Sequence, residues 1–369
     1  MKYRVPFLLF TMKLSSLFEN RAYVINNKTS SNLEDIELIN TILINLKKPI
    51  KPSSIEFISI NDDYDTYKVV SDEGLSFCVK VSLDENCDSI NKESKIIRNI
   101  NELIRPGYIE DGIIKIGDNL RYIITSFEES ESLNQIGRSF LLDNFDSFCY
   151  SYKLLQEEKN INFNYKDRLD LVFQKIEIEN YFTKDAINAI KNYTDFKTIK
   201  SFLFEIKNEI INTYDPSFDK YKNICHGNLK MSTIISNKNL FKFINFENSF
   251  NCHIFSDLSN LTIQLGLPEN LDLYILKEFC KNLNIEYSVS TNQLYQKFYY
   301  ISLCENVIHM TVDYLKEVYV YSSLRTDKII DISNRFSFAY ERFFKIKSFN
   351  KFHSFIMKTI TEPILGQKA

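Results

Sequence analysis

The sequence predicts an α+β fold in which a small antiparallel sheet comes first and a mostly helical region follows. Between residues 55 and 126, short segments alternate apolar and polar residues and are separated by turn-forming residues, as in hairpin strands. Beyond residue 132, apolar residues recur at steps of three and four, as on one face of a helix. Glycine (8) and proline (7) are scarce among 369 residues, which favours long helices and argues against a β-sandwich or a disordered chain.

Composition and charge indicate an ordinary globular protein. Hydrophobic residues make up 44% and charged residues 25% of the sequence. The formal net charge of −3 provides no bulk electrostatic attraction for nucleic acid or for an anionic membrane surface. No segment approaches the roughly 20 apolar residues needed to span a bilayer. We therefore expect neither a nucleic-acid partner nor a membrane partner.

The cysteines indicate a reducing compartment. All seven are scattered along the chain, and no two form a C-x-x-C pair. This pattern fits reduced thiols better than a disulfide framework, so we expect a cytoplasmic location. The four histidines do not cluster with the cysteines, and a structural zinc site is therefore not expected.

The first part of the chain is predicted to be a helix followed by three strands. Residues 1–28 are ambiguous and form a lead-in to the first domain. Ser31 and Glu34 form a capping box that opens a helix, and Lys47-Lys48-Pro49 ends it. The expected strands are 57–60, 66–70 and 76–82. The turn between the first two strands contains no glycine but three aspartates, Asp62, Asp63 and Asp65.

A lysine on the third strand and a glutamate on the next helix are predicted to form an ion pair. The helix expected over 89–104 has Ile90 and Ile97 on its apolar face, and Glu93 falls on that same face. A carboxylate buried in an apolar stripe costs several kcal/mol unless it is paired. Lys80 is the natural partner. The alternative is a glutamate at the edge of the stripe that reaches water.

The remaining chain is predicted to add two strands and then helices. The strands cover 113–116 and 120–126, and the polar segment Phe127-Glu128-Glu129-Ser130 follows them. Apolar residues up to Leu155 predict a helix of about 17 residues that begins near Ser139 or Asp143. Further helices are expected over 166–181, 184–192, 196–213, 270–283, 291–322 and 327–345.

The stretch from 225 to 258 is the most distinctive in the chain. It begins C-H-G-N-L-K-M-S-T, and two strand segments, 233–235 and 240–246, flank a short turn before an irregular segment. Polar side chains at the ends of such strands are the usual arrangement for a site. The pattern resembles the aminoglycoside phosphotransferase and choline kinase family, relatives of protein kinases. The residues that match at the family's spacings are His226-Gly227, Leu229, Ile244, Phe246-Glu247 and Asp257-Leu258.

This resemblance implies a protein-kinase-like fold of two lobes. Residues 29–130 form the expected small lobe, and residues 131–369 form the large lobe with the catalytic-type loop at 225–258. The segment after Ser126, which includes Glu128, resembles the hinge whose backbone groups hydrogen-bond adenine. An ordinary acidic linker is the alternative. The glycine-free turn 61–65 occupies the place of the phosphate-covering loop, where its carboxylates oppose phosphate binding.

The resemblance also implies roles for four further residues and a cofactor. Lys80 and Glu93 match the family's phosphate-contacting lysine and its glutamate partner. His226 and Asp257 correspond to residues that hold the loop backbone and do not touch substrate. The implied cofactor is ATP with Mg²⁺.

Three positions depart from the family pattern where its chemistry resides. Asn228 stands in place of the catalytic aspartate, Thr233 in place of a metal-binding asparagine, and Asn245 in place of a metal-binding aspartate. An amide is no base near neutral pH, and loss of a general base costs on the order of 10²–10⁴ in rate. Mg²⁺ prefers anionic oxygen in strict octahedral geometry. The carboxylates considered as replacement ligands are Glu247, Asp215 and Asp219.

Two functions are open on this basis. The first is a pseudokinase that binds a protein partner of unknown identity and takes nucleotide at most as a metal-independent ligand. The second is an active ATP-dependent phosphotransferase that acts on a hydroxyl of a small molecule, as retained Lys80, Glu93, Glu247 and Asp257 suggest. Family acceptors are often cations, and the residues available to hold a cation are Glu305, Tyr299, Tyr300, Tyr314, Tyr319 and Tyr321.

Overall fold

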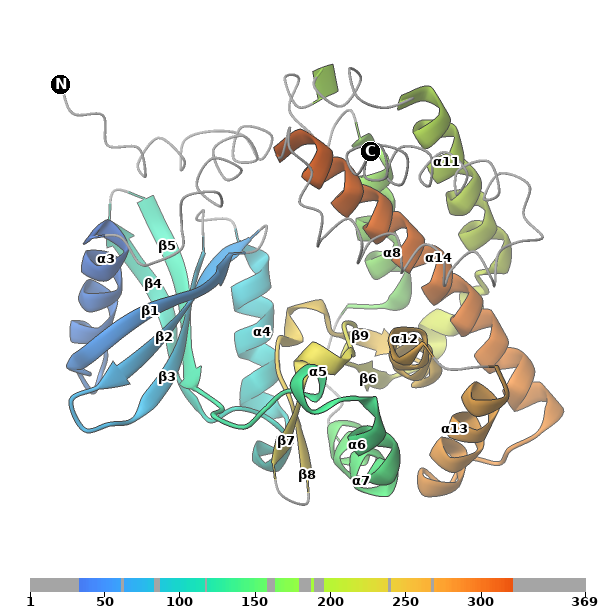
Figure 1. Cartoon of the computed structure of the whole chain (residues 1–369), viewed down its shortest axis with the longest axis horizontal. Coiled ribbons are helices and arrows are strands. Elements are labelled where there is room, and N and C mark those ends of the chain that lie inside the picture. The colour runs from blue at the N-terminus through green and yellow to red at the C-terminus, as the bar shows by residue number, and fades with distance from the viewer. Residues whose placement is uncertain are drawn as a thin grey trace, which may run out of the picture.

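The computed structural model describes residues 33–60, 63–82, 87–116, 118–157, 163–178, 187–188, 196–237, 240–266 and 269–320. They fold into a small lobe built on a five-stranded sheet and a larger, mostly helical lobe (Figure 1). The predicted α+β class and two-lobe arrangement are confirmed. The predicted lead-in 1–28, the helix 327–345 and most of the helix 184–192 lie outside the described residues.

The small lobe is an antiparallel sheet with one helix on each face. Its strands have the order β1-β2-β3-β5-β4, helix α3 covers one face, and helix α4 lies on the other (Figure 1). The predicted helix and strands of this region are confirmed, although β1 and β4 begin earlier than predicted. The bounds are α3 Leu33–Ile44, β1 Pro52–Ile60, β2 Tyr64–Ser71, β3 Ser76–Ser82, α4 Asp88–Asn99, β4 Tyr108–Ile116 and β5 Asp118–Ser126.

Alternation along the strands decides which side chains face α4. Thr66 lies opposite Lys80 across β2 and β3, so both side chains point to the α4 face. Asp65 points to the other face, where the Tyr67 hydroxyl donates a hydrogen bond to it (3.3 Å). The expectation that Asp65 belongs to the loop that opposes phosphate is therefore wrong, because this residue lies in β2 and faces α3. Asp63 accepts a hydrogen bond from Ser89 at the start of α4, and Asp62 lies outside the described residues.

Two of the predicted helices are each divided. The helix predicted over 89–104 ends at Asn99 because Ile100 is extended (φ −81°, ψ 154°), and a 3-10 helix then covers Glu102–Ile104. The helix predicted up to Leu155 consists of α6 (Arg138–Asp143) and α7 (Phe145–Leu155), which are separated at Asn144. Apolar spacing continues across both breaks, so periodicity alone does not reveal them.

In the residues that the structure describes, the large lobe contains helices and two short pairs of strands, β6–β9 and β7–β8. The segment before Leu258 is not the irregular loop expected from the sequence, because strand β9 and the start of helix α12 occupy it. None of the helices in the described part of the chain combines the length and the hydropathy of a membrane span. The bounds are α5 Leu133–Ile136, α8 Tyr165–Ile176, α11 Phe196–Thr213, η2 Pro216–Lys220, β6 Asn223–Cys225, η3 Met231–Thr233, β7 Ile234–Asn237, β8 Leu240–Phe243, η4 Phe246–Asn248, β9 Phe250–Cys252, α12 Phe255–Leu265, α13 Glu269–Asn282 and α14 Val289–Val320.

The hydrophobic core is continuous from one lobe to the other. Its larger cluster joins Ile90 and Ile97 of α4 to buried residues of the large lobe such as Phe246 and Leu258. A second cluster is confined to the small lobe, between α3 and the outer face of the sheet. Helix α4 packs against the 3-10 helix η4 of the large lobe. It therefore holds the inner face of the sheet close to the catalytic-type loop.

Candidate functional site

The catalytic-type loop is held by a buried carboxylate in the first turn of α12. Asp257 is 0% exposed, and it accepts hydrogen bonds from the backbone N–H groups of His226 (2.5 Å) and Gly227 (2.9 Å). The Tyr152 hydroxyl donates a third hydrogen bond to it at 2.9 Å. The hydrogen bonds from Asp257 therefore fix the conformation of the loop backbone between β6 and η3.

His226 ties the same loop to the segment after β8. Its Nε2 lies 2.8 Å from the carbonyl oxygen of Ile244, and its Nδ1 accepts a hydrogen bond from the Asn228 N–H (3.3 Å). Burial lowers the pKa of His226, which favours the neutral ring that these two contacts require. His226 and Asp257 thus both contact loop backbone in this structure.

The predicted ion pair between Lys80 and Glu93 is present. Lys80 Nζ lies 2.8 Å and 2.6 Å from the two carboxylate oxygens of Glu93, and these residues are only 7% and 2% exposed. Burial opposes the charged form of Lys80, but the surrounding groups, Glu93 foremost, together outweigh this effect and raise the lysine pKa well above its ordinary value. The lysine is therefore an ammonium ion at neutral pH.

The Lys80 ammonium has further oxygen neighbours besides Glu93. It donates a hydrogen bond to Oδ1 of Asn245 (2.9 Å) and another to the Tyr64 hydroxyl (3.3 Å). One carboxylate oxygen of Glu247 lies 4.0 Å away. An ammonium group has three N–H donors, so these neighbours engage all of its hydrogen-bonding capacity. Asn245 adopts the left-handed conformation (φ 66°, ψ 63°), which asparagine tolerates better than most residues.

The side chains at the positions of the catalytic base and metal ligands do not fit a magnesium ion. The Thr233 hydroxyl contacts the carbonyl oxygens of Asn228 (2.9 Å) and Lys230 (3.0 Å) and accepts from the Lys230 N–H, so the loop backbone engages it. The amide oxygen of Asn245 already accepts from an ammonium. Glu247, two residues further on, has one buried carboxylate oxygen without a hydrogen bond to any described residue. Among the described residues, no three His, Cys, Asp or Glu side chains gather into a metal site.

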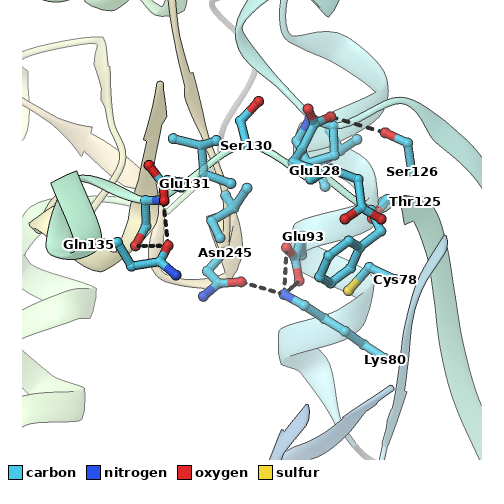
Figure 2. A pocket seen from close by; sticks show the side chains of 17 residues that line it. Cys78, Lys80, Glu93, Thr125, Ser126, Glu128, Ser130, Glu131, Gln135 and Asn245 are labelled. Atoms are coloured by element: carbon cyan, nitrogen blue, oxygen red, sulfur yellow. Dashed lines mark hydrogen bonds and ion pairs between the residues drawn. The ribbon is translucent and has the colours of Figure 1, made fainter. Parts of the chain in front are cut away.

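A cavity of about 310 Å³ opens between the sheet, the 127–132 segment and the β7–β8 hairpin. Figure 2 shows Lys80, Glu93 and Asn245 converging at one end and the 126–131 segment crossing the other. The Ser126 hydroxyl accepts from the Gly107 N–H (2.7 Å) and donates to Glu128 (3.1 Å). Lys242 of β8 donates to both oxygens of Glu128 at 2.9 Å. The side chains of Ser126 and Glu128 are thus engaged within the protein.

Sequence reasoning missed the half-buried Arg168, which forms an ion pair with the candidate cation ligand Glu305. Arg168 Nη1 lies 2.6 Å from Glu305 Oε2, and Nη2 donates to the Gly227 carbonyl oxygen (3.3 Å). Arg168 follows Tyr165 by three residues and precedes Val172 by four, so it falls on the apolar face of α8. This is the same signal that identified Glu93. Of the candidate tyrosines, Tyr300 donates to Glu209 (2.7 Å), and the side chains of Tyr314, Tyr319 and Tyr321 lie outside the described residues.

Solved structures share this fold over most of the chain, at low sequence identity. Amicoumacin kinase hAmiN, in complex with AMP-PNP, Ca²⁺ and Ami, has a TM-score of 0.56 at 10% identity, covering 84% of this chain and 94% of its own. A thermostable mutant of aminoglycoside phosphotransferase APH(4)-Ia scores 0.53 at 9% identity, covering 77% and 98%. Choline kinase LicA from Streptococcus pneumoniae scores 0.53 at 12% identity, covering 84% and 99%. No protein-family profile and no curated protein matches the sequence. The chain therefore has the fold of the aminoglycoside phosphotransferases and choline kinases.

Proposed function

We propose that this protein is a pseudokinase, in which the two lobes, 29–130 and 131–369, meet at the 127–132 hinge without carrying out metal-dependent phosphoryl transfer. In this proposal, the cavity between the lobes binds a nucleotide-type ligand without metal. The retained contacts of His226 and Asp257 preserve the shape of the loop, and the proposed role of that shape is recognition of a protein partner.

The contact between Lys80 and Asn245 is the observation that carries this proposal. In a kinase-like site, the lysine contacts nucleotide phosphates while an aspartate binds the metal. Here the residue at the aspartate position is neutral, and its oxygen is 2.9 Å from the lysine ammonium. Asn228, at the base position, cannot accept a proton near neutral pH. In the same cleft, the residue at the base position is therefore no base, the residue at the metal-ligand position carries no charge, and the lysine is already hydrogen-bonded.

Restoring the two carboxylates tests the proposal. The full chain should show no Mg²⁺-dependent ATP turnover above that of its Lys80→Ala variant. The double variant Asn228→Asp/Asn245→Asp should gain Mg²⁺-dependent turnover on the order of 10²–10⁴-fold, since it regains a base and an anionic ligand. Asn284→Asp adds a charge at an exposed asparagine between α13 and α14 that also has a positive φ (57°), and it should gain nothing. Turnover by the unaltered chain above the Lys80→Ala background contradicts the proposal.

An active phosphotransferase acting on a small-molecule hydroxyl is the second candidate. The intact pair of Lys80 and Glu93 favours it, because the same pair must be formed in active kinases. Glu247, with one buried oxygen free of hydrogen bonds among the described residues, is then the residue that holds the metal. Glu247→Gln should abolish turnover under this candidate and change nothing under the first.

A further inference from the structure

Strand β4 forms one edge of the small-lobe sheet and is the edge better suited to an added strand. It pairs with β5 alone, as β1 at the other edge pairs with β2 alone. Strand β1 begins with Pro52, and two irregularities interrupt its register. Features of this kind keep an edge from pairing with another chain. Strand β4 contains no proline, and its register with β5 is unbroken from Glu110 to Ile116.

The hydrogen bonds of β5 show which backbone groups of β4 reach the open edge. The Ser126 N–H donates to the carbonyl oxygen of Gly107, just before β4. The Arg121 N–H donates to the Ser82 hydroxyl of β3. Because the register between β3 and β5 is regular, even-numbered residues of β5 bond to β4 and odd-numbered residues bond to β3.

Alternate residues of β4 therefore direct their backbone groups to the open edge. Ile113 lies opposite Arg121, so its N–H and C=O point away from β5. Those of Asp111 and Lys115, two residues away on either side, do the same. In the part of the chain that the structure describes, these groups form no hydrogen bond. Backbone donors and acceptors arranged in this way are a template for one further strand.

The side chains of these three residues share one face of the sheet. Ile113 is 57% exposed, and Lys115 is exposed and forms no ion pair with any described residue. Asp111 Oδ1 accepts hydrogen bonds from Arg98 and Tyr108 of the same chain, and Oδ2 has no hydrogen-bond partner among the described residues. The edge thus presents an exposed apolar side chain between a carboxylate and an ammonium group.

We propose that β4 pairs antiparallel with β4 of a second copy of this chain, about a two-fold axis at Ile113. Between identical antiparallel strands, only this register brings Asp111 opposite Lys115 of the other copy. It also keeps the outward backbone groups in phase, because each pair formed by residues 111, 113 and 115 then exchanges two hydrogen bonds. Cross-strand pairs of opposite charge and of β-branched residues stabilise such a sheet. The sheets of the two copies join into one continuous sheet, with the same surface used by both copies.

Sedimentation velocity of the full chain tests the pairing. We expect a reversible monomer–dimer equilibrium across micromolar concentrations. Hydrogen exchange at the amides of residues 111, 113 and 115 should be slow in the dimer and become fast on dilution. This dimer does not depend on the proposed function, because the cavity between the lobes is lined by residues outside β4.

Two charge variants test the register. Lys115→Glu places a like charge opposite Asp111 in both symmetric pairs and should weaken the dimer about tenfold or more, with part of the affinity restored by salt. Ile113→Lys sets two ammonium groups against each other at the two-fold axis and should leave the chain monomeric at the same concentrations. Both side chains are exposed, so the melting temperature of the monomer should stay the same. Lys222→Glu, a reversal of an exposed charge before β6, should not change the equilibrium.

Ile113→Cys tests the position of the axis. Residues that face each other in a hydrogen-bonded antiparallel pair have Cα atoms about 5.5 Å apart, within the range that a disulfide bridges. Mild oxidation should therefore link two copies of this variant into a covalent dimer. Ile58→Cys, at an exposed isoleucine of β1 (43%), and the unaltered chain should stay unlinked.

The proposal is overturned by a chain that stays monomeric throughout the micromolar range, by a dimer that Lys115→Glu and Ile113→Lys leave unchanged, or by equal cross-linking at positions 58 and 113. A monomer whose β4 amides exchange slowly also overturns it, because another segment of the same chain, such as residues 1–32, then occupies the edge. The proposed function fails on a separate readout, Mg²⁺-dependent turnover by the unaltered chain, whatever its oligomeric state.

Discussion

At the scale of single residues, the buried His226 and the half-buried His253 have to stay neutral in the folded protein. Nδ1 of His226 accepts from the Asn228 N–H, and Nδ1 of His253 accepts from the Phe255 N–H (3.2 Å). A protonated imidazole has no acceptor nitrogen. Burial lowers the pKa of both rings, and that of His253 falls to about 4.

We expect the free energy of unfolding to decrease as the pH falls from 6.5, the ordinary histidine pKa, towards about 4. The unfolded histidines take up protons in this window and the folded ones do not, so stability is complete above 6.5 and is lost below it. Each histidine adds a slope of up to about 1.4 kcal/mol per pH unit. Urea unfolding across this window measures the slope, and His253→Gln should lessen it. A slope unchanged in that variant argues against this origin.

Gly227 is the residue whose replacement should damage the loop most. It has a positive φ (+78°), and a Cβ there would lie 1.9 Å from the carbonyl oxygen of Asn248. Gly74 has nearly the same φ (+80°) but no heavy atom within 4 Å of a Cβ. Gly74→Ala should therefore cost about 1–2 kcal/mol from backbone strain alone, and Gly227→Ala about 3 kcal/mol or more. If both variants lose the same free energy of unfolding in denaturant, the contact with Asn248 does not contribute to the difference.

At the scale of elements, an ion pair between Glu128 and Lys242 connects the hinge to the β7–β8 hairpin. Lys242→Met leaves a partly buried carboxylate unpaired, which should lower the free energy of unfolding by about 1–3 kcal/mol. Hydrogen exchange at the backbone amides of 128–131 should become faster. The reversed pair Glu128→Lys/Lys242→Glu should recover most of both effects. Lys51→Met breaks an exposed pair with Asp72 and should leave hinge exchange unchanged.

Helix α12 shows why some helices and strands of this fold cannot be predicted from the sequence. Ten of its eleven residues are buried, so it has no polar face, and Ser256, Ser259 and Thr262 interrupt the apolar run. A helix enclosed on all sides lacks the periodic signal by which helices are identified. Strands β6 and β9 contain three residues each, too few for a pattern of alternation. By contrast, α4 and β3 carry clear patterns, and these patterns together with the family resemblance predicted the contact between Glu93 and Lys80.

The candidate site was predictable in position but not in contacts. Spacing placed Asn228, Thr233 and Asn245 in the loop, yet it could not show that Lys80 donates to Asn245, 165 residues further along. Spacing also could not show that Arg168 forms an ion pair with Glu305, since this contact depends on how α8 and α14 pack. Side-chain partners between distant segments are a property of the assembled fold.

At the scale of the whole molecule, the shared core predicts that the two lobes unfold together. The larger cluster runs through α4 into the large lobe, so unfolding either lobe alone exposes apolar surface of the other. We expect one calorimetric transition whose van't Hoff and calorimetric enthalpies agree. Ile97→Ala in the shared cluster and Ile42→Ala in the outer cluster should each move this one peak to lower temperature. Two resolved peaks in either variant would contradict a common unfolding unit.

The left-handed backbone at Asn245 has a consequence for the history of the site. Asparagine and aspartate have nearly the same shape, and both are tolerated at positive φ. Exchange between them at this position therefore requires no rearrangement of the surrounding backbone. A lineage with this fold can lose or regain the charge by one codon change while the rest of the protein keeps its structure. Loss of the charge at this position is therefore reversible, and it differs in that respect from loss of the loop.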